Sequence, residues 1–163
     1  MKRIIVALAF LTALSLPVSA QDFDKGMAAY KAGDYASAVQ EWTPLAAAGN
    51  EKAQVNLGSM YGQGQGVLQD YAEAAKWSRL AAEQGSAAGQ SNLGFMYSNG
   101  LGVLQNNVMA HMWYNIASAN GDEEGGTNRD RLAKQMTQAD ISKAQTMARE
   151  CMSSGYKKCG YGV

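Results

Sequence analysis

The sequence has very few of the residues on which most catalytic and metal centres depend. Among its 163 residues there are one histidine, His111, and two cysteines, Cys151 and Cys159. A Ser/His/Asp or Cys/His catalytic centre would have to use His111, which we expect to be a partly exposed helical residue. One histidine and two cysteines also do not supply metal-ligand spacing. The composition therefore predicts a protein that is not an enzyme and that needs no metal or cofactor.

The sequence also lacks a net charge of one sign and, beyond its first segment, any long apolar run. Ile4–Leu16 is apolar except for Thr12 and Ser15, follows the basic Met1–Arg3 and precedes the small residues Val18–Ala20. This order is typical of a secretory signal peptide, with cleavage predicted after Ala20. The apolar run is shorter than the roughly 20 residues that span a bilayer, although an N-terminal anchor helix is the alternative. We therefore expect a periplasmic or secreted protein without stable membrane insertion.

Removal of residues 1–20 would leave 12 Lys and Arg residues against 14 Asp and Glu residues. This balance does not favour nucleic acid or an anionic membrane surface as a partner. In an oxidising compartment, Cys151 and Cys159 are expected to form a disulfide. Its short loop would hold the tail, residues 156–158, against the last helix.

The sequence contains one internal repeat. The residues from Gln54 read QVNLGSMYGQGQGVLQD, and those from Gln90 read QSNLGFMYSNGLGVLQN. The 36-residue offset relates residues 51–85 to residues 87–121 without a gap, and 15 of the 35 positions are identical. A fixed period between about 20 and 50 residues is the signature of a solenoid. Residues 23–50 show a shorter version of the same pattern and are expected to be an atypical first unit.

Each unit predicts two helices joined by a turn. Glycines such as Gly64 and Gly66 are expected to supply positive φ angles, and the glycine-rich stretch lacks the Lys-Ser/Thr of a phosphate-binding loop. Val67 and Leu68 are expected to enter the core after this loop, and Leu80 to lie on the buried face of the second helix. Recurring tryptophans are also expected in the core, and several polar residues precede the predicted helices as N-caps: Asp34, Asn50, Asp70, Ser86 and Asn106. Asp70 and Glu73 together match a capping box.

The repeat pattern changes after residue 121. Residues 122–126 are expected to form a flexible acidic connection, followed by a helix capped by Thr127 and a second helix that begins after Thr137. We interpret residues 122–163 as a C-terminal helical cap that covers the last repeat. No segment has the pattern of a strand, so the sequence predicts an all-α fold.

The stretch NLGSMYGQGQGVLQDYAEAAKWSRLAAEQG, residues 56–85, and its second copy resemble Sel1-like repeats of the tetratricopeptide superfamily. The resemblance covers about residues 23–121. It implies a short right-handed superhelix of helical hairpins that acts as an interaction scaffold, often in processes of the bacterial envelope. A cysteine-rich branch of the family also has cysteines spaced like Cys151 and Cys159. That branch suggests an alternative, a weak binder or hydrolase of β-lactams or peptidoglycan fragments, but here the repeats contain no cysteine.

In this superfamily the first helix of each hairpin lines the concave surface. The resemblance therefore places a binding surface for a protein or peptide on residues that recur in both units: Gln54, Asn56, Met60, Gln90, Asn92 and Met96. Methionine suits an adaptable peptide-binding surface. For the asparagines, a structural hydrogen bond is an equally open interpretation. A third possibility is a self-assembling structural component of the envelope.

Overall fold

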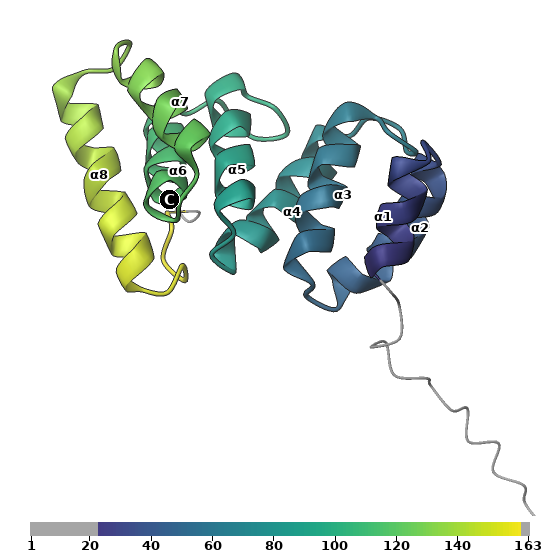
Figure 1. The fold of residues 1–163 in the computed structure, drawn as a ribbon. Coiled ribbons are helices and arrows are strands. Elements are labelled where there is room, and N and C mark those ends of the chain that lie inside the picture. The colour runs from purple at the N-terminus through teal and green to yellow at the C-terminus, as the bar shows by residue number, and fades with distance from the viewer. Residues whose placement is uncertain (1–22, 161–163) are drawn as a thin grey trace, which may run out of the picture.

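The computed structural model describes residues 23–160, which fold into eight helices without a strand (Figure 1). The predicted all-α fold is therefore confirmed for this range, whereas the predicted signal peptide, residues 1–20, lies outside the described residues. The helices are α1 (Phe23–Lys31), α2 (Tyr35–Ala47), α3 (Glu51–Gln63), α4 (Tyr71–Glu83), α5 (Ala87–Asn99), α6 (Asn107–Ala119), α7 (Glu123–Ala133) and α8 (Gln138–Ser153).

The helices pack as successive hairpins. Helices α1 and α2, α3 and α4, and α5 and α6 form the pairs, and the second helix of each pair packs against the first helix of the next (Figure 1). Each hairpin thus contacts mainly its neighbours along the chain, which is the arrangement of a solenoid. The order follows from the period of the sequence, since each 36-residue unit supplies one hairpin whose apolar faces are covered only by the adjacent units.

The glycine loops adopt the predicted conformation. Gly64 and Gly66 have φ angles of 68° and 72°, a region that L-residues with a side chain rarely adopt. A Cβ atom on Gly66 would overlap the backbone of Tyr35, so the loop sits directly on the start of the preceding second helix. After this turn Val67 packs against the core, but Leu68 is 92% exposed. The prediction that Leu68 enters the core is therefore wrong, because adjacent residues of this short extended segment point in opposite directions.

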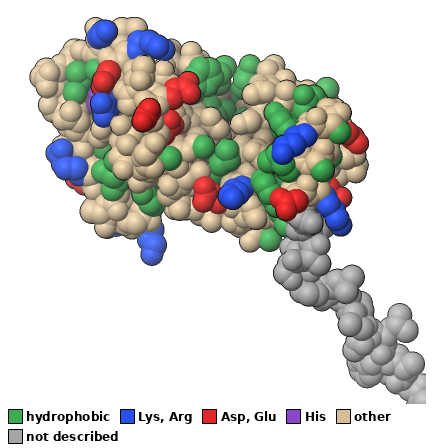
Figure 2. Space-filling model, viewed as in Figure 1, with side chains coloured by type: hydrophobic (Ala, Val, Ile, Leu, Met, Phe, Trp, Pro, Cys, Tyr) green, Lys and Arg blue, Asp and Glu red, His purple; other side chains and the backbone are tan. Residues whose placement is uncertain are grey.

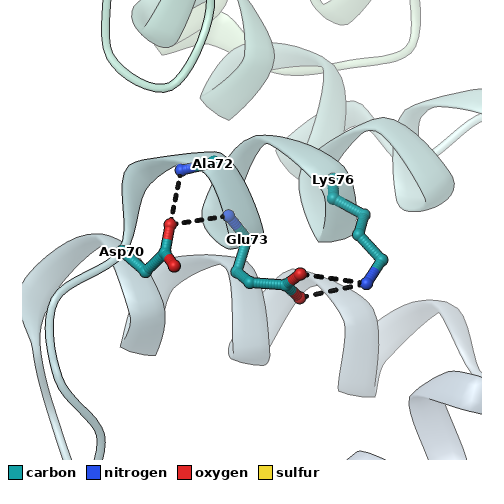
Figure 3. A network of polar contacts seen from close by, with 4 residues as sticks. All are labelled: Asp70, Ala72, Glu73 and Lys76. Carbon is teal, nitrogen blue, oxygen red and sulfur yellow. Dashed lines mark hydrogen bonds and ion pairs between the residues drawn. The ribbon is translucent and has the colours of Figure 1, made fainter.

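All five predicted N-caps are confirmed, and Figure 3 shows the one at α4 in detail. The Asp70 carboxylate accepts hydrogen bonds from the backbone N–H groups of Ala72 at 2.8 Å and Glu73 at 3.0 Å. The reciprocal half of the predicted capping box is absent. The Asp70 N–H donates to the Tyr61 carbonyl instead, and the Glu73 carboxylate pairs with Lys76 at 3.0 Å. The Asp70 N–H group, which Glu73 would bind in a capping box, is therefore already engaged by the end of α3.

The core is built on the recurring tryptophans, as predicted. Trp42 and Trp113 are fully buried and Trp77 is almost so. A Cβ atom on Gly58 would lie 2.8 Å from the Ser78 hydroxyl, which explains the glycine inside α3 by the close approach of α4. The prediction for Leu80 is wrong, since this side chain is 37% exposed near the end of α4.

The C-terminal region differs from its prediction at its start. Asp122 caps α7, which begins at Glu123, so residues 122–126 are the first turn of a helix and not a flexible connection. Thr127 lies inside α7, where its hydroxyl donates to the Glu123 carbonyl at 3.1 Å. The starts of α3, α5 and α7 are each 36 residues apart, so the period continues in the structure although few residue identities remain after residue 121. Both α7 and α8 pack against α6, and Thr137 caps α8 as predicted.

The predicted disulfide is present. Cys151 and Cys159 are bonded and buried, with Cα atoms 4.5 Å apart. The tail also contacts residues outside the last helix. The Tyr156 hydroxyl accepts a hydrogen bond from the Asn120 side chain at 2.9 Å, and the Tyr156 ring lies against Gly85. The disulfide therefore holds a contact between the tail and the ends of α4 and α6. Within residues 23–160, no helix is long and apolar enough to cross a membrane.

Candidate functional site

Gln54 and Gln90 connect neighbouring hairpins from within the core. Each amide N–H donates to the end of the preceding second helix, Gln54 to the Ala46 carbonyl at 3.0 Å and Gln90 to the Ala82 carbonyl at 3.2 Å. Each amide oxygen accepts from the end of the following second helix, at 2.7 Å and 2.8 Å. Both side chains are buried. Their hydrogen-bonding groups thus hold three helices together and are not presented to a partner.

Met60 and Met96 are also core residues, which corrects the interpretation that they line an open groove. Their side chains are 1% and 5% exposed. Met60 belongs to the cluster that contains Trp42 and Leu57, while Met96 packs in the smaller cluster around Ala74. The physical reason is helical geometry, since position 60 follows the buried Leu57 by three residues and therefore shares its face. Each methionine still lines a hollow, Met60 between α1 and α3 and Met96 between α3, α4 and α5, but it exposes only a small part of its side chain there.

Asn56 and Asn92 are the predicted residues that remain accessible in part. Asn56 lines a hollow of about 210 Å³ between α1 and α3, and Asn92 lines one of about 200 Å³ between α3, α4 and α5. Asn128, 36 residues further along, lines a hollow between α5 and α7 with Asn92. We refer to the surface formed by α1, α3, α5 and α7 as the first-helix face. Asparagines thus recur along it at the repeat period, although few other residues after position 121 match the preceding unit.

Phe95 is the functional candidate that sequence reasoning missed. Its side chain is 53% exposed on α5 and lines hollows on both sides of this helix. The repeat aligns it with Ser59, so the comparison of the two units contains no signal at this position. The available signal was its helical phase, because Phe95 lies two residues beyond the buried Leu93 and so on another face of the helix.

The electrostatics of the visible face are weak. Figure 2 shows charged side chains in small scattered groups of both signs, among a larger area of uncharged atoms. Around Asn92 and Phe95 the α3–α5 hollow is lined by serine, glutamine, asparagine, tyrosine and small or apolar residues. Such a lining favours a ligand with apolar and neutral polar groups over a highly charged one.

His111 is buried, which corrects the expectation of partial exposure. It is 2% exposed, and its Nδ1 atom has no hydrogen-bond partner within residues 23–160. Burial lowers the pKa of the imidazole below its usual value, and the positive charge of Arg129 adds to this effect. The side chain is therefore neutral at pH 7. Without a hydrogen-bonded nucleophile, its geometry is that of a core residue and not of a general base.

Two further arrangements bear on chemistry. The residues from Ser154 to Lys157 match a Ser-x-x-Lys pattern, but the Ser154 hydroxyl donates to the Cys151 carbonyl at 2.7 Å and accepts from two backbone N–H groups. The hydrogen bonds of the Ser154 hydroxyl thus stabilise the turn between Cys151 and Cys159. In the described part of the chain, no group of three or more His, Cys, Asp or Glu residues could hold a metal ion.

Comparisons with known proteins agree with this geometry. The model of the Sel1 repeat family matches residues 51–86 and 87–122, which correspond to the two predicted units. A similar solved structure is c5321, a protective antigen present in uropathogenic Escherichia coli strains that displays an SLR fold. It is 33% identical, with a TM-score of 0.78, over 85% of this chain and 31% of that chain.

A second similar structure is a Sel1 repeat protein from Oxalobacter formigenes. It is 29% identical, with a TM-score of 0.66, over 85% of this chain and 59% of that one. This chain thus spans less than two thirds of the length of either protein. A search of curated proteins found no match.

Proposed function

The chain carries two Sel1 repeats in tandem, and we propose that it is a non-catalytic scaffold that binds a partner protein or peptide of the bacterial envelope on its first-helix face. This fold is commonly that of a protein-interaction scaffold. The proposed surface is centred on Asn92 and Phe95 of α5, which replace the buried methionines and glutamines of the sequence-based prediction.

The observation that carries the proposal is the position of Phe95. A large aromatic side chain that is half exposed among hollows differs from an isolated surface apolar residue, because a partner can cover both the ring and its surroundings. Aromatic residues are enriched among the positions that dominate binding energy at protein interfaces. The rim of the α3–α5 hollow adds Tyr71 and Ser59, which combine apolar area with hydroxyl groups.

Two features support the envelope as the compartment. The predicted signal peptide would direct the chain across a membrane, and the disulfide is a bond that persists in oxidising compartments. The single histidine is neutral and buried, and the Ser154 hydroxyl is engaged in a turn. These positions support a binding role over a hydrolytic one.

The test is affinity capture followed by direct binding measurements. The protein, expressed from its full sequence, is crosslinked in native envelopes, and captured proteins are identified by mass spectrometry. We expect one dominant partner that binds the purified protein and is lost with Phe95→Glu and with Asn92→Arg. The matched control is Leu68→Glu, which places the same charge on another exposed apolar residue outside this face.

The outcome that contradicts the proposal is equally clear. Equal capture by Phe95→Glu, Asn92→Arg and the unsubstituted protein would place the interface elsewhere. Failure to capture any partner, while circular dichroism shows an intact fold, would remove the basis for a protein-binding scaffold.

A further inference from the structure

A second hollow beside Phe95 has a lining of different chemistry. It lies between α5, the loop that follows α5, and α7, and it encloses about 520 Å³. This volume is within the range of about 300–1,000 Å³ that is usual for small-ligand sites. Five of its eleven lining residues carry a side-chain amide: Asn99, Gln105, Asn107, Asn128 and Gln135.

Three of these amides are held in place by one hydrogen bond each. Asn99 and Gln105 donate their side-chain N–H groups to backbone carbonyls of α5, at 2.8 Å and 2.9 Å. The Asn128 side-chain oxygen accepts from Arg131 at 3.2 Å. These bonds leave the amide oxygens of Asn99 and Gln105 as acceptors and the amide nitrogen of Asn128 as a donor. The hollow is thus lined by both kinds of hydrogen-bonding group, with their orientations already restricted.

The remaining lining supplies an apolar platform and balanced charge. Phe95 contributes a half-exposed ring, and Tyr114 lies at the same hollow. Glu124 and Arg131 are the charged residues of the lining, one of each sign. A strongly anionic or cationic ligand would therefore gain one favourable partner and meet one unfavourable charge. The balance favours a neutral ligand with many hydroxyl groups.

We infer that the hollow between α5 and α7 binds a neutral oligosaccharide, with the Phe95 ring against the apolar face of a sugar and the amides of Asn99, Gln105 and Asn128 on its hydroxyl groups. A hydroxyl is both a donor and an acceptor, so it pairs with either end of an amide. Each pyranose also has a face of C–H groups that suits an aromatic ring.

A peptide fits this lining less well. Specific peptide sites provide apolar pockets for side chains, whereas here the amides and the charged pair occupy most of the wall. The inference is separate from the proposed protein-binding role, which depends on Asn92 and the α3–α5 hollow. The α3–α5 hollow and the α5–α7 hollow share only Phe95, so variants at the amides distinguish the two roles.

The test uses the protein produced from its full sequence with ¹⁵N labelling. Side-chain amide signals of Asn and Gln are recorded by nuclear magnetic resonance during titration with maltohexaose, cellohexaose and N-acetylated chitohexaose. We expect at least one hexasaccharide to shift the signals of Asn99, Gln105 and Asn128 in a saturable way. Phe95→Ala should weaken that binding by about two- to tenfold, the loss expected for one aromatic contact.

Two variants provide the controls. Gln135→Ala changes an amide of the same hollow and should weaken saccharide binding while leaving capture of a protein partner intact. Asn56→Ala removes an equivalent amide from the hollow between α1 and α3 and should leave saccharide binding unchanged. The dispersion of backbone signals reports that each variant is folded.

Three results would overturn the inference. The first is the absence of saturable shifts with all three hexasaccharides. The second is equal affinity in the unsubstituted protein and in Phe95→Ala combined with Gln135→Ala. The third is saturation of the same amide signals by a neutral capped peptide, such as a Gly-Ser hexamer, without any response to the saccharides, which would assign the hollow to a peptide.

Discussion

Replacement of Gly102 by alanine tests how the loops hold the repeats in register. Gly102 has a φ angle of 67°, and a Cβ atom at this position would overlap the backbone carbonyl of Tyr71 at the start of α4. Gly33 provides the matched control. It has a similar φ angle of 78°, but a Cβ atom there would have no heavy atom within 4 Å. Both substitutions therefore place a side chain at a positive φ angle, but only Gly102→Ala also makes that side chain overlap another segment of the chain.

The magnitudes follow from these two terms. A side chain in the left-handed region costs roughly 1–2 kcal/mol, partly offset by about 0.4–1 kcal/mol from the lower entropy of the unfolded chain. Gly33→Ala should therefore lower the free energy of unfolding by about 1 kcal/mol. Gly102→Ala adds an overpacking cost of about 1–3 kcal/mol, because the obstructing atoms are backbone and cannot rotate away. Its unfolding midpoint should lie roughly 3–9 °C below that of Gly33→Ala.

The assay is reversible thermal and urea unfolding, followed by circular dichroism under the same conditions for both variants. Similar urea slopes would show that both variants unfold to comparable states. Equal unfolding free energies for Gly102→Ala and Gly33→Ala would refute the reasoning. They would mean that the contact between the loop and α4 does not contribute to stability and that only the helices hold the repeats together.

Three further predictions concern the core and the tail. Gln90→Ala should lower the unfolding free energy by about 2–3 kcal/mol, measured by urea titration, because one buried and one partly buried hydrogen bond are lost. A change below about 0.5 kcal/mol, the size of surface effects, would contradict this. Since burial lowers the pKa of His111, its contribution to stability is complete above about pH 6.5 and decreases as the pH falls. Between pH 7.5 and 5, the unfolding midpoint should therefore decrease less in His111→Gln than in the unsubstituted protein. Equal decreases in the two proteins would exclude the effect. Replacing both Cys151 and Cys159 by alanine should cost about 2–3 kcal/mol in calorimetry, with an unchanged midpoint as the refuting result.

The proposed binding surface could be predicted only in part. The repeat pointed to α3 and α5, but the helical period does not separate the buried Met60 from the partly accessible Asn56, because residues four apart lie on the same face of a helix. Phe95 could not be found by comparing the units, because the repeat aligns it with Ser59 and the recurring residues mostly hold the hairpins together. Gln54 shows the same distinction, since its recurrence reflects a structural hydrogen bond.

The sequence by itself determined the helices, their caps, the glycine turns and the order of the hairpins. These features depend on short-range chemistry, such as the side chain of Asn50 reaching a nearby N–H group or a glycine accepting a positive φ angle. Composition predicted the disulfide partners, because only two cysteines are present.

Only the tertiary structure decided which side chains are exposed and which segments meet. His111 was expected to be partly exposed but is buried, because its burial depends on helices that pack against α6. Leu68 was expected in the core but is exposed. The continuation of the 36-residue period into α7 is likewise a property of packing, since few residues of α7 are identical to those of α5 at this offset. The hollows beside Phe95 exist for the same reason: a cavity is the space left between elements, and no local pattern of residues encodes it.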